Sequence, residues 1–323
     1  MGIRLLLLLS ALPCCCMIRG QEVKDLRTFV EPLPDEEILR ACEYRMAPLG
    51  MSGAARAAWV IFDRGQDYLQ WFLDRRVRAF ANEHNLALIL AIHCRSKERE
   101  DMIVEPSKGV GRALFAALSQ FATSEAHPEL NSVGIIPMGW SGAGSLVGRL
   151  AGFAAARYIA GIAYAPGQYE PLGMDTITLS SEAIRSPQLI IANGGDNIDG
   201  TERPYQYFRR YFDKGAPWTF AVQNRTPHCC LQNAQNLILE WLHAVLTVER
   251  PKAAGEQGFL HVERSAVLDE WKRETFNASS CRIGPMGKPM PGEIPAGWMP
   301  SRVFSQEWIA FVGRPKPTAV WKP

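Results

Sequence analysis

The stretch that decides the fold is Val133-Gly134-Ile135-Ile136-Pro137-Met138-Gly139-Trp140-Ser141-Gly142-Ala143-Gly144. Its first half is an apolar run of the length of a buried strand, and the residues after Gly142 have the small, apolar composition of a closely packed helix. Ser141 therefore lies where a strand is predicted to turn into a helix. Such a turn exposes the serine hydroxyl above the sheet, and it requires small neighbours because the helix packs close to the strand. This pattern makes Ser141 the candidate nucleophile.

The rest of the chain from about residue 57 repeats the same alternation of short apolar runs and longer helical patterns. Continuous apolar strands that alternate with helices are typical of a mostly parallel, doubly wound sheet with helices on both faces, so the fold class is α/β. The expected strands are 58–62, 86–92, 133–138, 158–164, 188–192 and 218–222, and the expected helices are 68–84, 111–123, 142–155, 204–213 and 231–248.

A candidate general base lies in the loop 224–228, between the last expected strand and the last expected helix. A serine hydroxyl is a weak nucleophile without such a base. His228 ends this loop at the carboxyl end of a strand, where functional groups of parallel sheets collect, so it can reach Ser141. His93, which directly follows the strand 86–92, is the alternative among the six histidines.

Two aspartates follow the strand 188–192, in the sequence Asn193-Gly194-Gly195-Asp196-Asn197-Ile198-Asp199. A carboxylate there would orient His228 and stabilise its charged form. We favour Asp196 because it directly follows the glycine turn, and Asp199 stays open as the alternative acid.

The remaining site candidates are backbone N–H groups that could bind an oxyanion, and one aromatic residue. The N–H of Gly142 lies at a predicted helix N-terminus, where negative charge is favoured. A second donor is expected in the loop after the strand 58–62, and the N–H of Gln66 is our choice. Trp140, beside the nucleophile, either lines an acyl pocket or fills the core.

From about Ala57 to Val248 the chain resembles the α/β-hydrolase superfamily, and most of all its secreted branch near polyhydroxybutyrate depolymerases, feruloyl esterases and dienelactone hydrolases. The motifs that carry the resemblance are Gly139-Trp140-Ser141-Gly142-Ala143, Gly195-Asp196 and Pro227-His228, with Arg64-Gly65-Gln66 similar to a His-Gly-x oxyanion loop. The chain order Ser, Asp, His is also that of α/β-hydrolases. Two positions depart from the pattern, because Ala143 replaces the usual last glycine and an arginine precedes Gly65.

The resemblance implies an α/β-hydrolase fold and hydrolysis of a small-molecule or polymeric carboxylic ester through an acyl-enzyme, with no cofactor. Two other functions stay open. The first is a peptidase or acyltransferase on the same fold. The second is a non-catalytic binding protein on a hydrolase scaffold, which predicts that His228 lies too far from Ser141 to form a hydrogen bond.

The two ends of the chain differ from its middle. A basic residue, a short leucine run and small residues at the N-terminus are typical of a signal peptide, which we expect over residues 1–20. The protein would then be secreted or periplasmic. The hydrolase domain is expected over 21–250, and an irregular C-terminal extension packed on it over 251–323, because 285–300 is rich in Gly, Pro and Met.

Composition and cysteine content narrow the range of partners. A formal net charge of +2 with interspersed charges gives no reason to expect a nucleic-acid partner, and no segment is long and apolar enough to predict a transmembrane helix. No CxxC or HExxH pattern supports a metal site.

Beyond the signal peptide, the pairing of the five cysteines stays open. We expect the two adjacent cysteines to lie in distinct environments, because a disulfide between neighbouring residues is strained. These cysteines are Cys42, Cys94, Cys229, Cys230 and Cys281.

Overall fold

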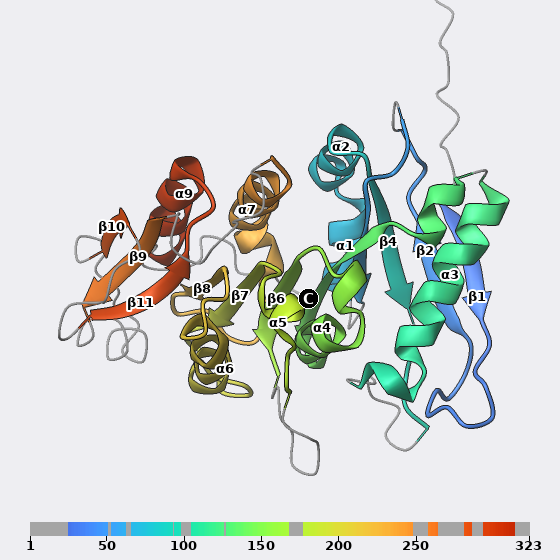
Figure 1. Ribbon diagram of the computed structural model, residues 1–323, viewed down its shortest axis with the longest axis horizontal. Helices are drawn as coiled ribbons and strands as arrows, with labels where there is room; N and C mark the ends of the chain where they lie inside the picture. The colour runs from blue at the N-terminus through green and yellow to red at the C-terminus, as the bar shows by residue number, and fades with distance from the viewer. Residues whose placement is uncertain are drawn as a thin grey trace, which may run out of the picture.

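One mixed β-sheet of eleven strands runs through the described part of the protein (Figure 1). This computed structural model describes residues 25–50, 53–62, 66–92, 94–97, 105–125, 127–167, 177–247, 258–263, 281–285 and 293–313. The strand order is β1-β2-β4-β3-β5-β6-β7-β8-β11-β9-β10.

The six central strands are parallel to one another and confirm the expected α/β architecture. Nearly every residue in them is buried, because both faces of the sheet are covered by helices. These strands are β4 (Leu86–Ile92), β3 (Ala57–Phe62), β5 (Gly134–Ser141), β6 (Gly161–Pro166), β7 (Gln188–Asn193) and β8 (Trp218–Gln223).

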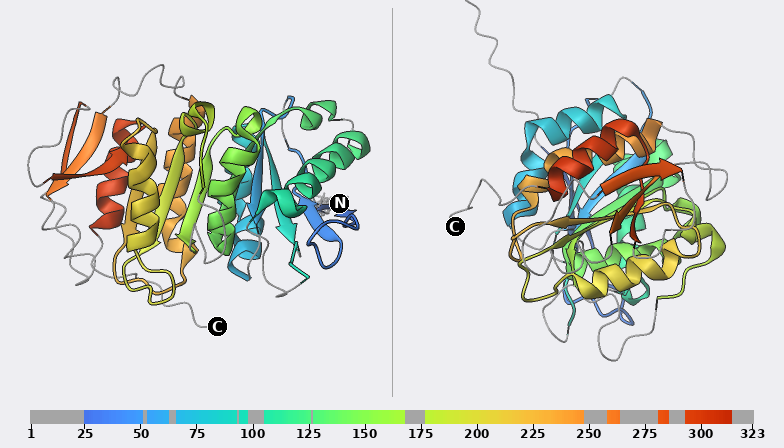
Figure 2. Two further views of the ribbon diagram at one scale, coloured as in Figure 1. Left: turned by 60° about the horizontal axis from the view of Figure 1, so that its bottom comes forward. Right: turned by 90° about the vertical axis from the view of Figure 1, so that its left-hand side faces the viewer.

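Helices cover the two faces of the sheet (Figure 2, right). On one face lie α2 (Arg75–Glu83), α7 (Gln235–Thr247) and α9 (Arg302–Val312), with α1 (Gln66–Leu73) against β3 and β4. On the opposite face lie α4 (Gly142–Phe153) and α6 (Glu202–Phe212). Helix α3 (Val110–Ser124) packs near β1, and the short α5 (Ser181–Ile184) packs near α4. None of the helices in the described ranges is long and apolar enough to cross a bilayer.

One expected helix, 68–84, is two helices in the structure. Asp74 has an extended backbone, and its side chain accepts hydrogen bonds from the N–H groups of Arg76 and Val77. An aspartate in this position caps the start of a new helix, so the chain turns between α1 and α2. The continuous apolar spacing across both helices concealed this break.

The N-terminal edge of the sheet was not predicted. Strands β1 (Leu26–Val30) and β2 (Cys42–Met46) pair antiparallel with each other, and β2 pairs antiparallel with β4. Two charged residues, Glu43 and Arg45, interrupt the apolar pattern of β2, and their side chains form an ion pair of 2.7 Å. A disulfide between Cys42 and Cys94 joins this edge to the segment after β4.

The described parts of the C-terminal segment are more regular than its composition indicated. Strands β9 (Gly258–Glu263), β10 (Cys281–Pro285) and β11 (Glu293–Trp298) continue the sheet beyond β8. Gly297 pairs with Thr219 of β8 at a positive φ, and a β-carbon there would clash with the backbone of Trp218. The indole N–H of Trp308 in α9 donates to the carbonyl of Phe220 at 2.9 Å. A residue typical of turns is thus part of a strand that has neighbours on both sides.

Candidate active site

Ser141 lies at the predicted strand–helix turn. It is the last residue of β5, and Gly142 is the first residue of α4. Its φ of 54° and ψ of −125° form a strained backbone that is rare for a residue with a side chain. A β-carbon at Gly139 would clash with the carbonyl group of Ala143, so the first glycine of the motif is required by this close approach. Because Gly139 has no side chain, Ala143 fits where the motif usually has glycine.

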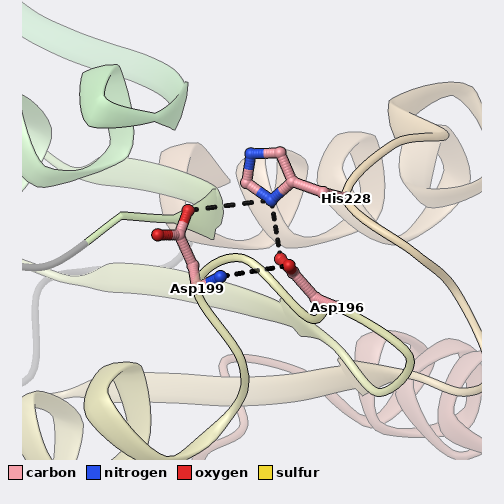
Figure 3. A group of neighbouring side chains, drawn as sticks. All are labelled: Asp196, Asp199 and His228. Carbon is pink, nitrogen blue, oxygen red and sulfur yellow. Dashed lines mark hydrogen bonds and ion pairs between the residues drawn. The ribbon is translucent and has the colours of Figure 1, made fainter.

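His228 and Asp196 form a close pair (Figure 3). The Nδ1 atom of His228 lies 2.7 Å from Oδ2 of Asp196. The other carboxylate oxygen of Asp196 accepts from the N–H groups of Ile198 at 2.8 Å and Asp199 at 3.1 Å. Both side chains are largely shielded from solvent, with 12% of His228 and none of Asp196 exposed. A carboxylate in this position holds the imidazole in one orientation with Nε2 free to act as an acceptor.

The environment of Asp196 favours its charged form. Burial is the largest effect and acts to raise the pKa of Asp196. The hydrogen bond with His228, the two backbone N–H groups and the charge of His228 oppose burial, and together they hold the pKa below its ordinary value of 3.8. Asp196 is therefore ionised at neutral pH.

Asp199 lies between the other two groups. Its Oδ2 accepts a long hydrogen bond of 3.4 Å from the Ser141 hydroxyl and lies 3.7 Å from Nδ1 of His228. The described side chains of Ser141 and His228 form no hydrogen bond with each other. The structure thus brings the expected base and acid into contact, while the expected nucleophile is bonded to the alternative acid. The ligand atoms of Asp196, Asp199 and His228 all lie within 4.8 Å of one another.

Trp140 lies against the base. Its ring centroid is 4.9 Å from that of His228 and 6.4 Å from that of Tyr68, with which it is stacked. The indole Nε1 of Trp140 is buried, and none of the described residues forms a hydrogen bond with it. Trp140 therefore packs on the imidazole, a contact that the sequence did not predict.

The two candidate oxyanion donors have equivalent positions. Gln66 is the first residue of α1, and Gly142 is the first residue of α4. The N–H of a first helical residue has no partner inside its helix. Because β3 and β5 are parallel neighbours, with Phe62 opposite Gly139, both helices start at the carboxyl ends of the strands, on the same side of the sheet. Arg64, Gly65 and the alternative base His93 lie outside the described residues.

The cysteines next to His228 contradict an expectation. Cys229 and Cys230 form a disulfide with each other, so the prediction of distinct environments for them is wrong. Cys230 has a left-handed backbone with φ of 77°, and this turn brings the two neighbouring sulfur atoms together. Cys94, whose pairing was open, is bonded to Cys42.

Sequence reasoning missed one buried polar residue at this edge. Asn193 ends β7 and is fully buried. Its side chain contacts the loop that carries His228. The available signal was an amide at the end of an otherwise apolar strand, at the edge where functional groups collect.

Comparisons with known proteins agree with this architecture. No protein-family model and no curated protein matches the sequence. Among solved structures, the chain is similar to MGS-M1, an α/β-hydrolase enzyme from a Medee basin deep-sea metagenome library, with 14% identity, a TM-score of 0.51, and coverage of 69% of this chain and 99% of that one.

Two further structures are similar over comparable shares of the chain. Esterase 2 of Thermogutta terrifontis has 14% identity and a TM-score of 0.48, over 68% of this chain and 94% of its own. The lid-free serine hydrolase XC6422 of Xanthomonas campestris has 12% identity and a TM-score of 0.44, over 69% and 94%. Of these three superpositions, the one with MGS-M1 exceeds a TM-score of 0.5, and at 14% identity it indicates a shared fold. Together with the parallel sheet and the strained turn at Ser141, this likeness shows that the chain has the α/β-hydrolase fold.

Proposed function

We propose that the protein is a serine hydrolase that cleaves carboxylic esters through an acyl-enzyme, with Ser141, His228 and Asp196 as its triad. One observation carries the proposal. A hydrogen-bonded Asp196–His228 pair lies at the same sheet edge as a serine held in a strained turn at a helix N-terminus. Structural packing alone does not require this combination, whereas nucleophilic catalysis requires all of its parts.

The proposed reaction uses these groups in the following order. Ser141 rotates its hydroxyl from Asp199 to Nε2 of His228, which takes the proton as the oxygen attacks the ester carbonyl. Asp196 stabilises the imidazolium at Nδ1. The N–H groups of Gly142 and Gln66 bind the oxyanion. His228 then protonates the leaving alcohol, and water releases the acid by the reverse sequence. Trp140 forms one wall of the acyl pocket beside His228.

The choice of esters rests on the motifs shared with the secreted branch of polyhydroxybutyrate depolymerases, feruloyl esterases and dienelactone hydrolases. The proposed substrate is accordingly a small-molecule or polymeric ester. Peptidase and acyltransferase activity require the same nucleophile, so p-nitrophenyl esters of graded chain length should be compared with peptide anilides and with an added alcohol acceptor. Faster turnover of the anilides, or transfer to the alcohol, would replace the proposed reaction.

The test of the nucleophile is covalent labelling by a fluorophosphonate probe. Wild-type protein should be labelled and should hydrolyse the esters, and Ser141→Ala should lose both, with a fall in kcat on the order of 10⁶-fold. Ser145 is a matched control, since it is a buried serine one turn further along α4. Ser145→Ala should keep the labelling. Equal labelling of wild type and Ser141→Ala would exclude the mechanism.

A second candidate function, a non-catalytic binding protein, has one observation in its favour, namely that the Ser141 hydroxyl is bonded to Asp199 and not to His228. Catalytic hydrogen bonds are often long or misaligned before substrate binds, so this observation is also compatible with an enzyme. The two candidates differ in the labelling experiment. The binding protein predicts that wild-type protein stays unlabelled while it is folded.

We further propose that the protein is exported and that residues 1–20 are removed. The two disulfides, Cys42–Cys94 and Cys229–Cys230, support an oxidising compartment. Intact mass measurement of the protein recovered from the periplasm or medium should show the loss of the first 20 or so residues. Full-length protein in the cytosol would contradict this proposal.

A further inference from the structure

The two peptide carbonyls on either side of His228 share one donor. The side-chain amide nitrogen of Asn193 donates to the carbonyl oxygen of Pro227 at 2.7 Å and to that of Cys229 at 3.1 Å. We call these two bonds the Asn193 bridge. Asn193 is fully buried at the end of β7, three residues before Asp196. The bridge therefore connects the segment that carries the acid with both flanks of the base.

Further bonds hold the same two loops side by side. The backbone N–H of Gly194 donates to the carbonyl of Gln223 at 2.9 Å, and that of Gly195 donates to the carbonyl of Thr226 at 2.9 Å. Tyr164 of β6, also buried, contacts the carbonyl of Cys229 through its hydroxyl. Within the described ranges, the backbone bonds between the two loops stop at Thr226, and the Asn193 bridge extends the contact to the peptide units around His228.

We propose that Asn193 is a positioning residue for the base: its bridge fixes the peptide units that flank His228 so that Nδ1 faces Asp196. This inference rests on the proposed function, since it assigns Asn193 a role in the same site. The side-chain nitrogen of Asn193 donates from a strand end to both carbonyls. The Pro227 carbonyl also accepts from the N–H of Cys229 at 2.6 Å, within the same loop, and the Cys229 carbonyl also accepts from the Tyr164 hydroxyl. Without the bridge, residues 227–229 would keep the bonds to Tyr164 and Asp196 but would be held less firmly. A shift of about 1 Å in a catalytic group lowers turnover by about 10²-fold.

The main test is Asn193→Leu, which keeps the branched shape of the side chain and removes both donors. Gln188→Leu is the matched control, because Gln188 starts the same strand and is also buried. Its side-chain polar atoms form no hydrogen bond with any residue that the structure describes. We expect kcat for a p-nitrophenyl ester to fall about 10²-fold in Asn193→Leu. KM should change less than about threefold, because the substitution removes no contact that binds substrate and transition state equally. Gln188→Leu should keep wild-type kcat.

A second variant separates the hydrogen bonds from a general loss of packing. Asn193→Asp keeps the shape of the side chain and can donate one bond when its carboxyl group is protonated. The carboxyl group would lie near Asp196, Asp199, His228 and the Tyr164 hydroxyl. We expect kcat of Asn193→Asp, divided by that of wild type at the same pH, to rise as pH falls. The same ratio for Asn193→Leu should stay low at every pH. This variant also keeps the inference testable if Asn193→Leu does not fold.

Three outcomes would overturn the positioning role. The first is a folded Asn193→Leu whose kcat lies within threefold of wild type. The second is an equal loss of kcat in Asn193→Leu and Gln188→Leu. The third is a ratio for Asn193→Asp that does not depend on pH. In each case, normal wild-type activity that is absent in Ser141→Ala would leave the proposed function intact. Absence of activity and labelling in wild type would remove the proposed function itself.

Discussion

His228 and Ser141 lie at the same edge of the sheet but are held there in different ways. His228 is held by side-chain bonds, to Asp196 at 2.7 Å and, through its neighbouring carbonyls, to Asn193. Ser141 is held by its backbone, in a turn with positive φ between β5 and α4. Its hydroxyl makes one long bond, of 3.4 Å, to Asp199.

Under the proposed mechanism, this difference indicates which part of the triad is in place before substrate binds. His228 can change its orientation only if its bond to Asp196 and the bonds on its neighbouring carbonyls break together. Rotation of the Ser141 hydroxyl about one side-chain torsion breaks a single long bond. In enzymes without substrate, catalytic hydrogen bonds are often long or poorly aligned and tighten in the Michaelis complex. We infer that the acid and base are organised in advance and that the nucleophile joins them when an ester enters.

The largest expected effect comes from the acid of the organised half. Asp196→Asn keeps the shape of the side chain but favours the wrong tautomer of His228, so we expect kcat to fall about 10⁴-fold. Steady-state hydrolysis of a p-nitrophenyl ester measures this loss. Asp213→Asn, at the exposed end of α6, is the control and should keep full activity. Near-normal activity of Asp196→Asn would show that His228 does not depend on Asp196.

The next largest effect comes from the backbone that holds the nucleophile. Gly139→Ala introduces a β-carbon that clashes with the carbonyl group of Ala143, so the start of α4 must move. We expect about 3 kcal/mol less free energy of unfolding and labelling that is slower by about 10²-fold. Gly152→Ala is the control, since its β-carbon would meet Leu179 at 3.4 Å, an ordinary contact. It should label normally; normal labelling of Gly139→Ala would show that the close approach is not required.

A smaller effect, of opposite sign, is expected from Asp199. Asp199→Asn replaces a charged acceptor of the Ser141 hydroxyl with a neutral one, and charge-assisted bonds are roughly twice as strong as neutral ones. The Ser141 hydroxyl should therefore leave the amide more easily than it leaves the carboxylate of Asp199 and turn to His228. We expect fluorophosphonate labelling about fivefold faster, the equivalent of about 1 kcal/mol. Labelling slower by about 10³-fold would instead identify Asp199 as the acid of the triad.

The smallest expected effect concerns stability in acid. Because the folded protein holds the pKa of Asp196 below its ordinary value of 3.8, the folded state binds its proton less readily than the unfolded state does. The contribution of Asp196 to stability is thus present above pH 3.8 and is lost as pH falls through the lower, folded-state pKa. Urea unfolding of wild type and Asp196→Asn should show a difference that shrinks below pH 3.8. A difference that is constant from pH 7 to pH 3 would contradict this.

The sequence predicted the centre of the molecule better than its edges. The six central strands are buried on both faces, so their apolar runs are visible in the sequence without knowledge of their neighbours. Strand β2, next to the edge strand β1, contains Glu43 and Arg45, whose charges are balanced by each other in the fold. Strand β11, between β8 and β9, contains Pro295 and Gly297, which are typical of turns in isolation. Neither strand has the continuous apolar run that identifies the central strands.

Within the site, contacts that cross between strands were the hardest to predict. The distances between Asp196 and His228 and between Asn193 and the His228 loop depend on how β7 and β8 align, because these strands are neighbours through sheet pairing and are separated by a helix along the chain. The disulfide pairing of Cys42 with Cys94 depends in the same way on β2 lying beside β4.

The sequence by itself determined the α/β architecture and the turn at Ser141, because local apolar periodicity and small residues impose them on a short stretch of chain. It also placed Asp196 and His228 at strand ends. The tertiary structure alone decided which of two nearby carboxylates bonds to which partner. Asp196 and Asp199 are three residues apart in one loop, and a difference of about 1 Å in the distance to Nδ1 of His228, 2.7 against 3.7 Å, distinguishes them. Hydrogen bonds depend on distances of this size, which no residue pattern specifies.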